Sequence, residues 1–294
     1  MQINRDASVA AVQSVADAMD VDLMAAAEGI IKIVNESMFG ALRLVSVEQG
    51  YDPRDFALVG FGGAGPLHAN ALGILTQAWP VIVPPGPGVL CAYGDATTRV
   101  QDEAARTYIT MASDLTADKL AEDLLTLKAR ASESLIEDGI DEDRLEVTYQ
   151  ADLRYAGQAF QITVEFTEAE LREKGVAVLT DQFDGEHEQL FTFKLGDGHE
   201  ILMIRAVVGA SVTFKADISI SKGSGNVSPA LIHQSRFFYE GDWHEAGIYD
   251  RGRLGAEDVV TGPAIVSEMD STTVVLPGHS ATVDAVGNLL IQPA

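Results

Sequence analysis

The residues with the clearest chemical potential form a glycine-rich stretch, FGGAGPLHA, at Phe61–Ala69. The apolar run Phe56–Phe61 before it is predicted to be a buried strand, and Pro66 stands where a helix would begin. Glycines in such a turn let a ligand approach the backbone, and the free N–H groups and the helix dipole favour negative charge. The natural ligand is the phosphate or ribose of a nucleotide, although tight packing of strand against helix explains the same pattern without a ligand.

This turn matches neither of two familiar phosphate-binding motifs. No Lys-Ser/Thr pair follows the glycines, and the GxGxxG spacing of a dinucleotide-binding fold is absent. His68 lies just beyond the turn and could contact phosphate or act as a general acid or base, because a free imidazole titrates near a pKa of about 6.5. The alternative for His68 is a packing or solvent-facing role on the helix surface.

A second group of polar residues lies in VTYQADLRYAGQ, at Val147–Gln158. Asp152 and Arg154 are predicted to share one face of a strand. With Tyr155 and Gln158 they could form a substrate or interdomain site, since Arg binds carboxylates with two parallel hydrogen bonds. An Asp–Arg ion pair that fixes the turn is the alternative, and the pattern leaves both open.

The remaining candidates have simpler explanations. His187 and His199 belong to no HxxxH or HExxH pattern, so no metal site is predicted. The single cysteine, Cys91, allows no internal disulfide, and its apolar neighbours predict a buried structural thiol. Asp270 and Ser271 precede an apolar strand, and turn or capping chemistry explains them.

Charge excludes several classes of partner. The 294 residues contain 20 Lys and Arg against 44 Asp and Glu, a formal charge of −24. Such a chain repels nucleic acid and anionic membrane surfaces, and no run of basic residues offsets this. No window of 18 apolar residues predicts a membrane span. The absence of an apolar leader and the single cysteine fit a cytoplasmic location.

The elements that position these residues follow from periodicity. Helices are expected at Arg5–Met19 and Asp22–Gln49, with Asp22 as N-cap and Gly50 ending the second. The turn is expected to open a short helix, Pro66–Leu72, closed by Gly73, before a strand at Val81–Val83. From residue 106 the remaining expected helices and strands are Arg106–Met111, Leu115–Glu137, Leu145–Tyr155, Ala159–Phe166, Glu168–Lys174, Thr180–Gln189, Glu200–Gly209, Arg236–Tyr239, Gly247–Tyr249, Ala264–Ser267, Thr272–Val275 and Ser280–Val283. Ser221–Val227 is the expected linker or loop.

Several segments together resemble the hydantoinase A/5-oxoprolinase family, which includes N-methylhydantoinase A and acetone carboxylase β subunits. The matching segments, in family order, are GYDPRD (50–55), LVGFGGAGPLHANALG (58–73), VIVPPGPGVLCAYG (81–94), DLRYAGQ (152–158), Asp250-Arg251 with Leu254, and GPAIVSEMDSTTVVLPG (262–278). The resemblance implies an α/β fold: the C-terminal part of an actin/hexokinase/Hsp70-like ATPase lobe at residues 1–105, followed by a β-rich α+β domain at residues 106–294.

In such a fold ATP lies between two lobes, and a late strand–glycine–helix element supports the adenosine end. By this resemblance Gly62, Gly63 and Gly65 are the expected nucleotide-binding residues. The DxGxT phosphate motif expected near the start of the family is missing here, so Mg²⁺ ligands are expected outside this segment. We therefore expect a C-terminal portion of a longer chain, or a subunit that pairs with a separate N-terminal lobe, inactive alone and assisted by a hydantoinase B-type subunit or domain.

Three functions are consistent with these observations. The first is ATP-dependent hydrolysis of a small cyclic amide of the hydantoin, N-methylhydantoin or 5-oxoproline type. The second is ATP-dependent carboxylation of a ketone, as in acetone carboxylase. The third is a non-catalytic module that scaffolds such a complex. His68, Asp152 and Arg154 are the weak catalytic candidates, and the substrate is not predicted.

Overall fold

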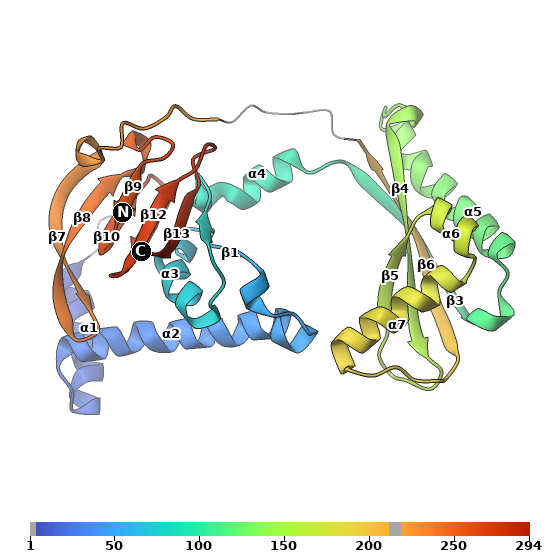
Figure 1. The fold of residues 1–294 in the computed structure, drawn as a ribbon, viewed down its shortest axis with the longest axis horizontal. Coiled ribbons are helices and arrows are strands. Elements are labelled where there is room, and N and C mark those ends of the chain that lie inside the picture. Colours follow the sequence, from blue (N-terminus) through green and yellow to red (C-terminus); the bar gives the residue numbers. More distant parts are fainter. Residues whose placement is uncertain (1–3, 212–218) are drawn as a thin grey trace. The chain divides into compact units, whose positions relative to one another are not determined.

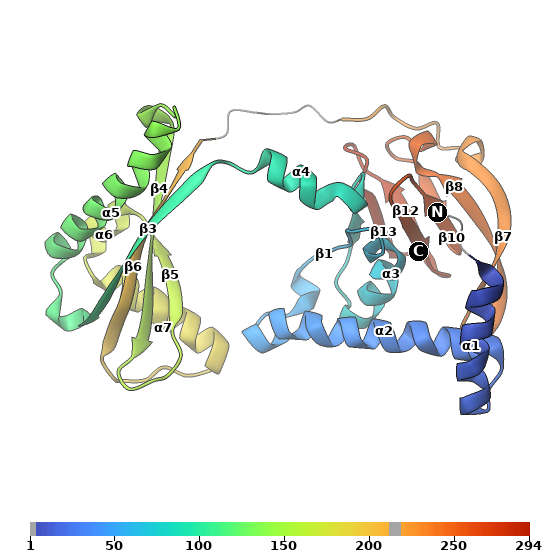
Figure 2. The same ribbon diagram turned by 180° about the vertical axis from the view of Figure 1, so that it is seen from behind.

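The computed structural model describes residues 4–211 and 219–294, drawn in Figures 1 and 2. Contacts divide the chain into two compact units. Unit 1 comprises residues 1–96 and 216–294, and unit 2 comprises residues 97–215. These units do not follow the predicted contiguous segments 1–105 and 106–294, because strands from the end of the chain complete a sheet begun near its start. The predicted boundary near residue 105 follows from the family resemblance, and it stays a prediction.

Two helices open unit 1, α1 (Arg5–Met19) and α2 (Leu23–Val45). The Asp22 carboxylate accepts hydrogen bonds from the N–H groups of Met24 and Ala25, both at 2.9 Å, which confirms the predicted N-cap. α2 ends at Val45, four residues earlier than predicted. A separate 3₁₀ turn then runs to Gly50, whose φ of 78° ends it. No helix among the described residues is both long enough and apolar enough to cross a membrane.

The sheet that positions the glycine-rich turn has the strand order β1-β2-β13-β12-β9. Its strands are β1 (Leu58–Val59), β2 (Val81–Val83), β9 (Val259–Thr261), β12 (His279–Val283) and β13 (Leu289–Pro293). β1 runs parallel to β2, and the other pairs are antiparallel. The predicted buried strand Phe56–Phe61 is wrong in extent, since only two residues pair and Val59 is 47% exposed at the sheet edge. β9 and β13 were not predicted.

The helix after the turn, α3 (Gly65–Thr76), is longer than predicted. Gly73 lies inside it rather than ending it, because a Cβ there would come within 2.5 Å of Val81 Cγ2. Gly73 therefore lets α3 pack closely on β2. The helix α4 (Leu90–Thr97) was not predicted, and Cys91 on it is exposed, so the prediction of a buried thiol is wrong.

A second sheet in unit 1 has the order β11-β10-β8-β7. Its strands are β7 (Leu231–Tyr239), β8 (Asp242–Asp250), β10 (Ala264–Ser267) and β11 (Thr272–Val275). α3 packs against β11, and the Asn70 side-chain oxygen accepts a hydrogen bond from the N–H of Leu276 at 2.8 Å. The expected linker Ser221–Val227 is held to this unit, since Lys222 pairs with Ala256 in a parallel bridge and Gly225 N–H donates to Asp258.

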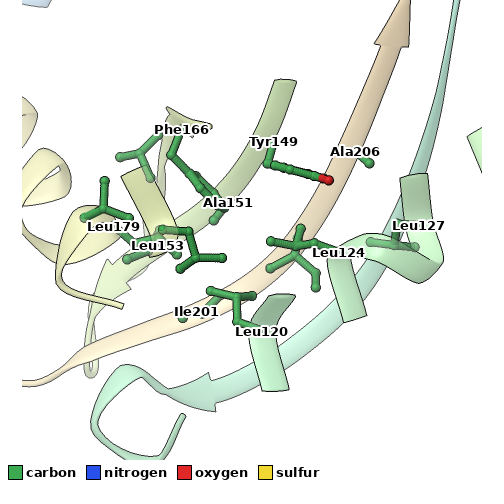
Figure 3. Packing of buried hydrophobic residues seen from close by; sticks show 14 of the residues in the cluster. Leu120, Leu124, Leu127, Tyr149, Ala151, Leu153, Phe166, Leu179, Ile201 and Ala206 are labelled. Carbon is green, nitrogen blue, oxygen red and sulfur yellow. The ribbon is translucent and has the colours of Figure 1, made fainter. Parts of the chain in front are cut away.

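Unit 2 is one antiparallel sheet with the order β3-β6-β4-β5, packed against helices. Its elements are β3 (Gln101–Met111), α5 (Ala117–Glu137), β4 (Leu145–Tyr155), β5 (Ile162–Phe166), α6 (Glu168–Lys174), α7 (Ala177–Phe191) and β6 (His199–Ala210). Figure 3 shows Leu120, Leu124 and Leu127 of α5 packed towards β4 and β6, as the periodicity predicts. Alternation along β4 directs Tyr149, Ala151 and Leu153 into this core.

Candidate nucleotide site

Three turns of unit 1 meet around the glycine-rich stretch. They follow β1 (residues 60–64), follow β2 (residues 84–88) and connect β10 to β11 (residues 268–271). Because β1 and β2 are parallel, the first two turns leave the same edge of the sheet, which is where open α/β sheets bind ligands. Gly62 N–H donates to the carbonyl of Pro87 at 2.7 Å, and the Ser271 hydroxyl donates to the carbonyl of Gly63 at 3.3 Å. The glycine turn is therefore held between the other two.

The structure requires glycine at some positions of this turn and not at others. A Cβ on Gly60 would lie 2.6 Å from Ala69 Cβ, so close packing against α3 requires glycine there. Gly62 has a φ of 86°, a left-handed conformation that favours glycine. On Gly63 and Gly65 a Cβ would come no nearer than 3.7 and 3.8 Å to other atoms, an ordinary contact. Packing therefore explains Gly60 but leaves Gly63 and Gly65 unexplained.

A buried ion pair joins the other two turns. Arg251, 8% exposed, donates through Nη1 to Glu268 Oε1 at 2.6 Å and through Nη2 to the carbonyls of Val83 and Gly287 at 2.8 and 2.9 Å. The second oxygen of Glu268 accepts from Gly86 N–H at 3.1 Å. Each group thus has several partners, as a buried pair needs. The sequence interpretation missed this pair, although both residues lie in segments that carry the family resemblance.

An apolar groove of about 300 Å³ adjoins the glycine turn on its α2 side. Residues of α2, β1 and α3 line it: Met38, Ala41, Leu42, Leu58, Val59, Gly60, Phe61, Gly65, Ala69 and Leu72. Its volume lies at the lower end of the range of small-molecule sites. A flat aromatic base is the kind of group that an apolar groove of this size accepts.

His68 joins two helices of unit 1. Its Nδ1 lies 2.8 Å from the side-chain oxygen of Asn35 on α2, and because that oxygen only accepts, Nδ1 carries the proton. Asn35 is buried, at 8% exposure. This hydrogen bond explains His68 as a residue that packs α3 against α2. The role of His68 as a general acid or base stays a prediction.

Asp152 and Arg154 are not paired with each other, so the alternative of a turn-fixing Asp–Arg ion pair is wrong. Asp152, 1% exposed, accepts from Arg205 Nη2 and from the Thr163 hydroxyl, both at 2.6 Å. Arg154 Nε donates to Glu200 at 2.7 Å. Neighbouring strands of the sheet supply both partners: Glu200 lies directly opposite Arg154, and Arg205 lies diagonal to Asp152, within reach of its long side chain. Both residues belong to unit 2, and the glycine turn belongs to unit 1.

A histidine cluster in unit 2 is also internally satisfied. His187, fully buried on α7, donates through Nδ1 to the carbonyl of Phe193 at 2.8 Å. Tyr155 O–H and His199 Nε2 both lie 2.7 Å from Asp184 Oδ1. Burial, followed by the hydrogen bond to Asp184, raises the pKa of Tyr155 to about 12. No group of three or more His, Cys, Asp or Glu side chains suited to a metal ion occurs within residues 4–211 and 219–294.

Comparison with known proteins assigns the family. Residues 1–104 match the hydantoinase/oxoprolinase family model, and residues 111–290 match the model of the hydantoinase/oxoprolinase C-terminal domain. Together these matches span most of the chain. The chain belongs to the hydantoinase/oxoprolinase family, as the sequence motifs predict.

Relatives with named activities include a caprolactamase subunit and a 5-oxoprolinase. The chain is 28% identical over 300 residues to the caprolactamase subunit alpha of Pseudomonas jessenii, covering 100% of this chain and 43% of that one. It is 27% identical over 282 residues to 5-oxoprolinase 1 of Arabidopsis thaliana, covering 94% and 22%. The chain thus spans less than half the length of these relatives.

Solved structures share the fold. The ATP-dependent caprolactamase from Pseudomonas jessenii superposes with a TM-score of 0.88 at 27% identity, over 99% of this chain and 43% of that one. The nucleotide-free acetone carboxylase superposes with a TM-score of 0.71 at 21% identity, over 100% and 43%. These likenesses confirm the predicted fold class, a mixed α/β fold of the hydantoinase type.

Proposed function

We propose that this chain is the C-terminal portion or a subunit of an ATP-dependent hydrolase that opens cyclic amides, and that Gly62, Gly63 and Gly65 receive the nucleoside end of ATP. The observation that supports the site best is that packing does not explain Gly63, where a Cβ would make only an ordinary contact, 3.7 Å from the backbone oxygen of Asp270. The hydrolase assignment is supported by relatives named for caprolactam and 5-oxoproline, both cyclic amides.

The chemistry explains why ATP is needed. An amide is a poor electrophile, and when bound with Mg²⁺, ATP would supply a phosphoryl group that converts the amide oxygen into a good leaving group. The residues of this chain have a positioning role. Gly62 and Gly63 let a ligand reach the backbone, and the amino end of α3 carries the positive end of a helix dipole. The pair of Arg251 and Glu268 keeps the surrounding turns fixed.

Further chain is needed for turnover. The Mg²⁺ ligands, the phosphate motif and a B-type subunit or domain are proposed to lie outside this segment. Two surfaces of unit 1 support this. No strand among the described residues pairs with the outer edge of β1. On α2, Ile31 and Ile33 are 46% and 67% exposed, an apolar surface that a packed lobe would cover.

Ketone carboxylation is the second candidate, because the acetone carboxylase fold matches along the whole chain. The non-catalytic module is the third. Assays of lactam opening and of bicarbonate-dependent ketone consumption, each with and without ATP, distinguish the two enzymes. Failure of both assays in the complete assembly, with the assembly intact, favours the scaffold.

The substitution Gly63→Val tests the nucleotide site. A branched side chain at Gly63 fits the fold but occupies the path of the ligand, so ATP affinity should fall on the order of tenfold or more. The measurement is titration with a fluorescent ATP analogue of the protein purified with the subunits that it assembles with. Gly185→Val on α7, where a Cβ would meet nothing within 4 Å, is the matched control. Unchanged ATP affinity in folded Gly63→Val would refute the site.

A further inference from the structure

Asp270 has an unusual position between the two glycine-containing turns. A Cβ on Gly88 would lie 2.8 Å from both the backbone oxygen and Oδ2 of Asp270, and one on Gly63 would lie 3.7 Å from that backbone oxygen. The Oδ2 atom is buried and has no hydrogen-bond partner among the described residues. A carboxylate oxygen is therefore held without a donor beside Gly88, in a turn that contacts the proposed nucleoside-binding turn.

The neighbouring acidic groups do not share this feature. Glu268, in the same turn, binds Arg251 and Gly86 N–H. Asp258 accepts from the N–H groups of Gly225 and Gly255 at 3.0 and 2.8 Å. A buried carboxylate oxygen normally finds such partners, because leaving it without a donor costs stability. Turn chemistry, the explanation suggested by the sequence, would leave Asp270 bonded to a backbone N–H.

We propose that Asp270 accepts a hydrogen bond from a ribose hydroxyl of the bound nucleotide and so determines the preference for a ribonucleotide. This inference rests on the proposed function. An ionised carboxylate only accepts hydrogen bonds and repels phosphate, so it faces the end of the ligand that carries donors. The apolar groove beside Phe61 suits the base and lies on the α2 side of the turn, which leaves the sugar for Asp270.

A double comparison tests this assignment. ATP, 2′-deoxy-ATP and 3′-deoxy-ATP are titrated, at fixed Mg²⁺, into the assembled protein and its Asp270→Ala variant. We expect one deoxynucleotide to bind the unaltered protein about tenfold more weakly than ATP, the size of a hydrogen bond to a charged group. In Asp270→Ala, ATP should weaken to the same level and the discrimination should vanish. Asp242→Ala, at an exposed carboxylate elsewhere in unit 1, is the control.

Each other outcome overturns the inference in a distinguishable way. If Asp270→Ala retains the ATP affinity and the discrimination, Asp270 does not contact the sugar, while the proposed function survives. If ATP weakens equally with all three nucleotides and the Mg²⁺ dependence disappears, Asp270 is a metal ligand. If the unaltered assembly binds no ATP, the proposed function fails with it. Loss of binding through unfolding is detected by melting: removing an unpaired buried charge should not lower the melting temperature.

Discussion

The turn at Gly62–Gly65 in unit 1 and the strand β4 in unit 2 were both predicted to carry functional residues at the end of a strand. They differ in how many of those groups have partners within the chain. On β4, Asp152, Arg154 and Tyr155 are all bonded to neighbouring residues of unit 2. Around the glycine turn, Asp270 Oδ2 has no hydrogen-bond partner among the described residues, and packing does not require glycine at position 63. Buried atoms without a partner also occur in unit 2, at Tyr149 O–H, Gln158 Oε1 and Arg205 Nε, so the difference rests on Asp270 and Gly63 together.

The largest expected effect is on stability, from breaking the β4 network. Asp152→Ala leaves Arg205 without its carboxylate and should destabilise unit 2 by about 3 kcal/mol. Urea denaturation followed by circular dichroism measures this, because both tryptophans, Trp79 and Trp243, lie in unit 1 and do not report on unit 2. ATP affinity should be unchanged in the folded variant.

Asp197→Ala, in an exposed loop of unit 2, is the matched control and should leave stability within about 0.5 kcal/mol of the unaltered protein. A drop in ATP affinity with little loss of stability in Asp152→Ala would reverse the comparison. It would then make β4 a ligand site.

An effect of intermediate size on stability should distinguish Gly60 from Gly63, two glycines of the same turn. Gly60→Val forces a side chain against Ala69 and should cost about 1–3 kcal/mol. Gly63→Ala meets only an ordinary contact and should leave stability within about 1 kcal/mol of the unaltered protein. Tryptophan fluorescence during urea denaturation follows unit 1 directly. Equal destabilisation by both substitutions would show that packing accounts for the whole turn.

The smallest expected effect is a pH dependence in unit 2. Burial raises the pKa of Asp184, but hydrogen bonds from Tyr155 and His199 outweigh it and lower the pKa below its usual 3.8. The ionised Asp184 side chain therefore contributes to the stability of the folded state. This contribution is present above about pH 4 and is lost as the pH falls through the lowered folded value.

Asp184→Asn removes this contribution, so the stability difference between unaltered protein and variant should shrink from pH 7 to about pH 3. Urea denaturation by circular dichroism at the two pH values measures it. A difference that stays constant or grows in acid would contradict the assigned hydrogen bonds.

Much of the fold could be predicted from periodicity. The helices Arg5–Met19 and Glu168–Lys174 and the strand Leu145–Tyr155 have their predicted bounds, because local pattern and capping determine them. β9 and β13 were missed since they are short and gain stability only from distant partners in the sheet. Gly73 was misassigned because its reason is a contact with β2, which the sequence does not display.

The candidate site was only half predictable. A glycine turn after a strand has a local signature, so Gly62 and Gly63 could be named. The partners of Asp152 and Arg251 come from residues 53 and 17 positions away, and no local spacing encodes them. Asp270 was explained as turn chemistry because its missing hydrogen-bond partner becomes visible only in three dimensions.

The central claim is that the turn at Gly62–Gly65 receives the nucleoside of ATP. A crystal structure of the complete assembly with a non-hydrolysable ATP analogue tests it most directly. The account predicts the sugar and base in contact with Gly62 and Gly63, with Asp270 at hydrogen-bond distance from a ribose hydroxyl. Nucleotide bound elsewhere, with side chains filling the space above Gly63, would contradict it.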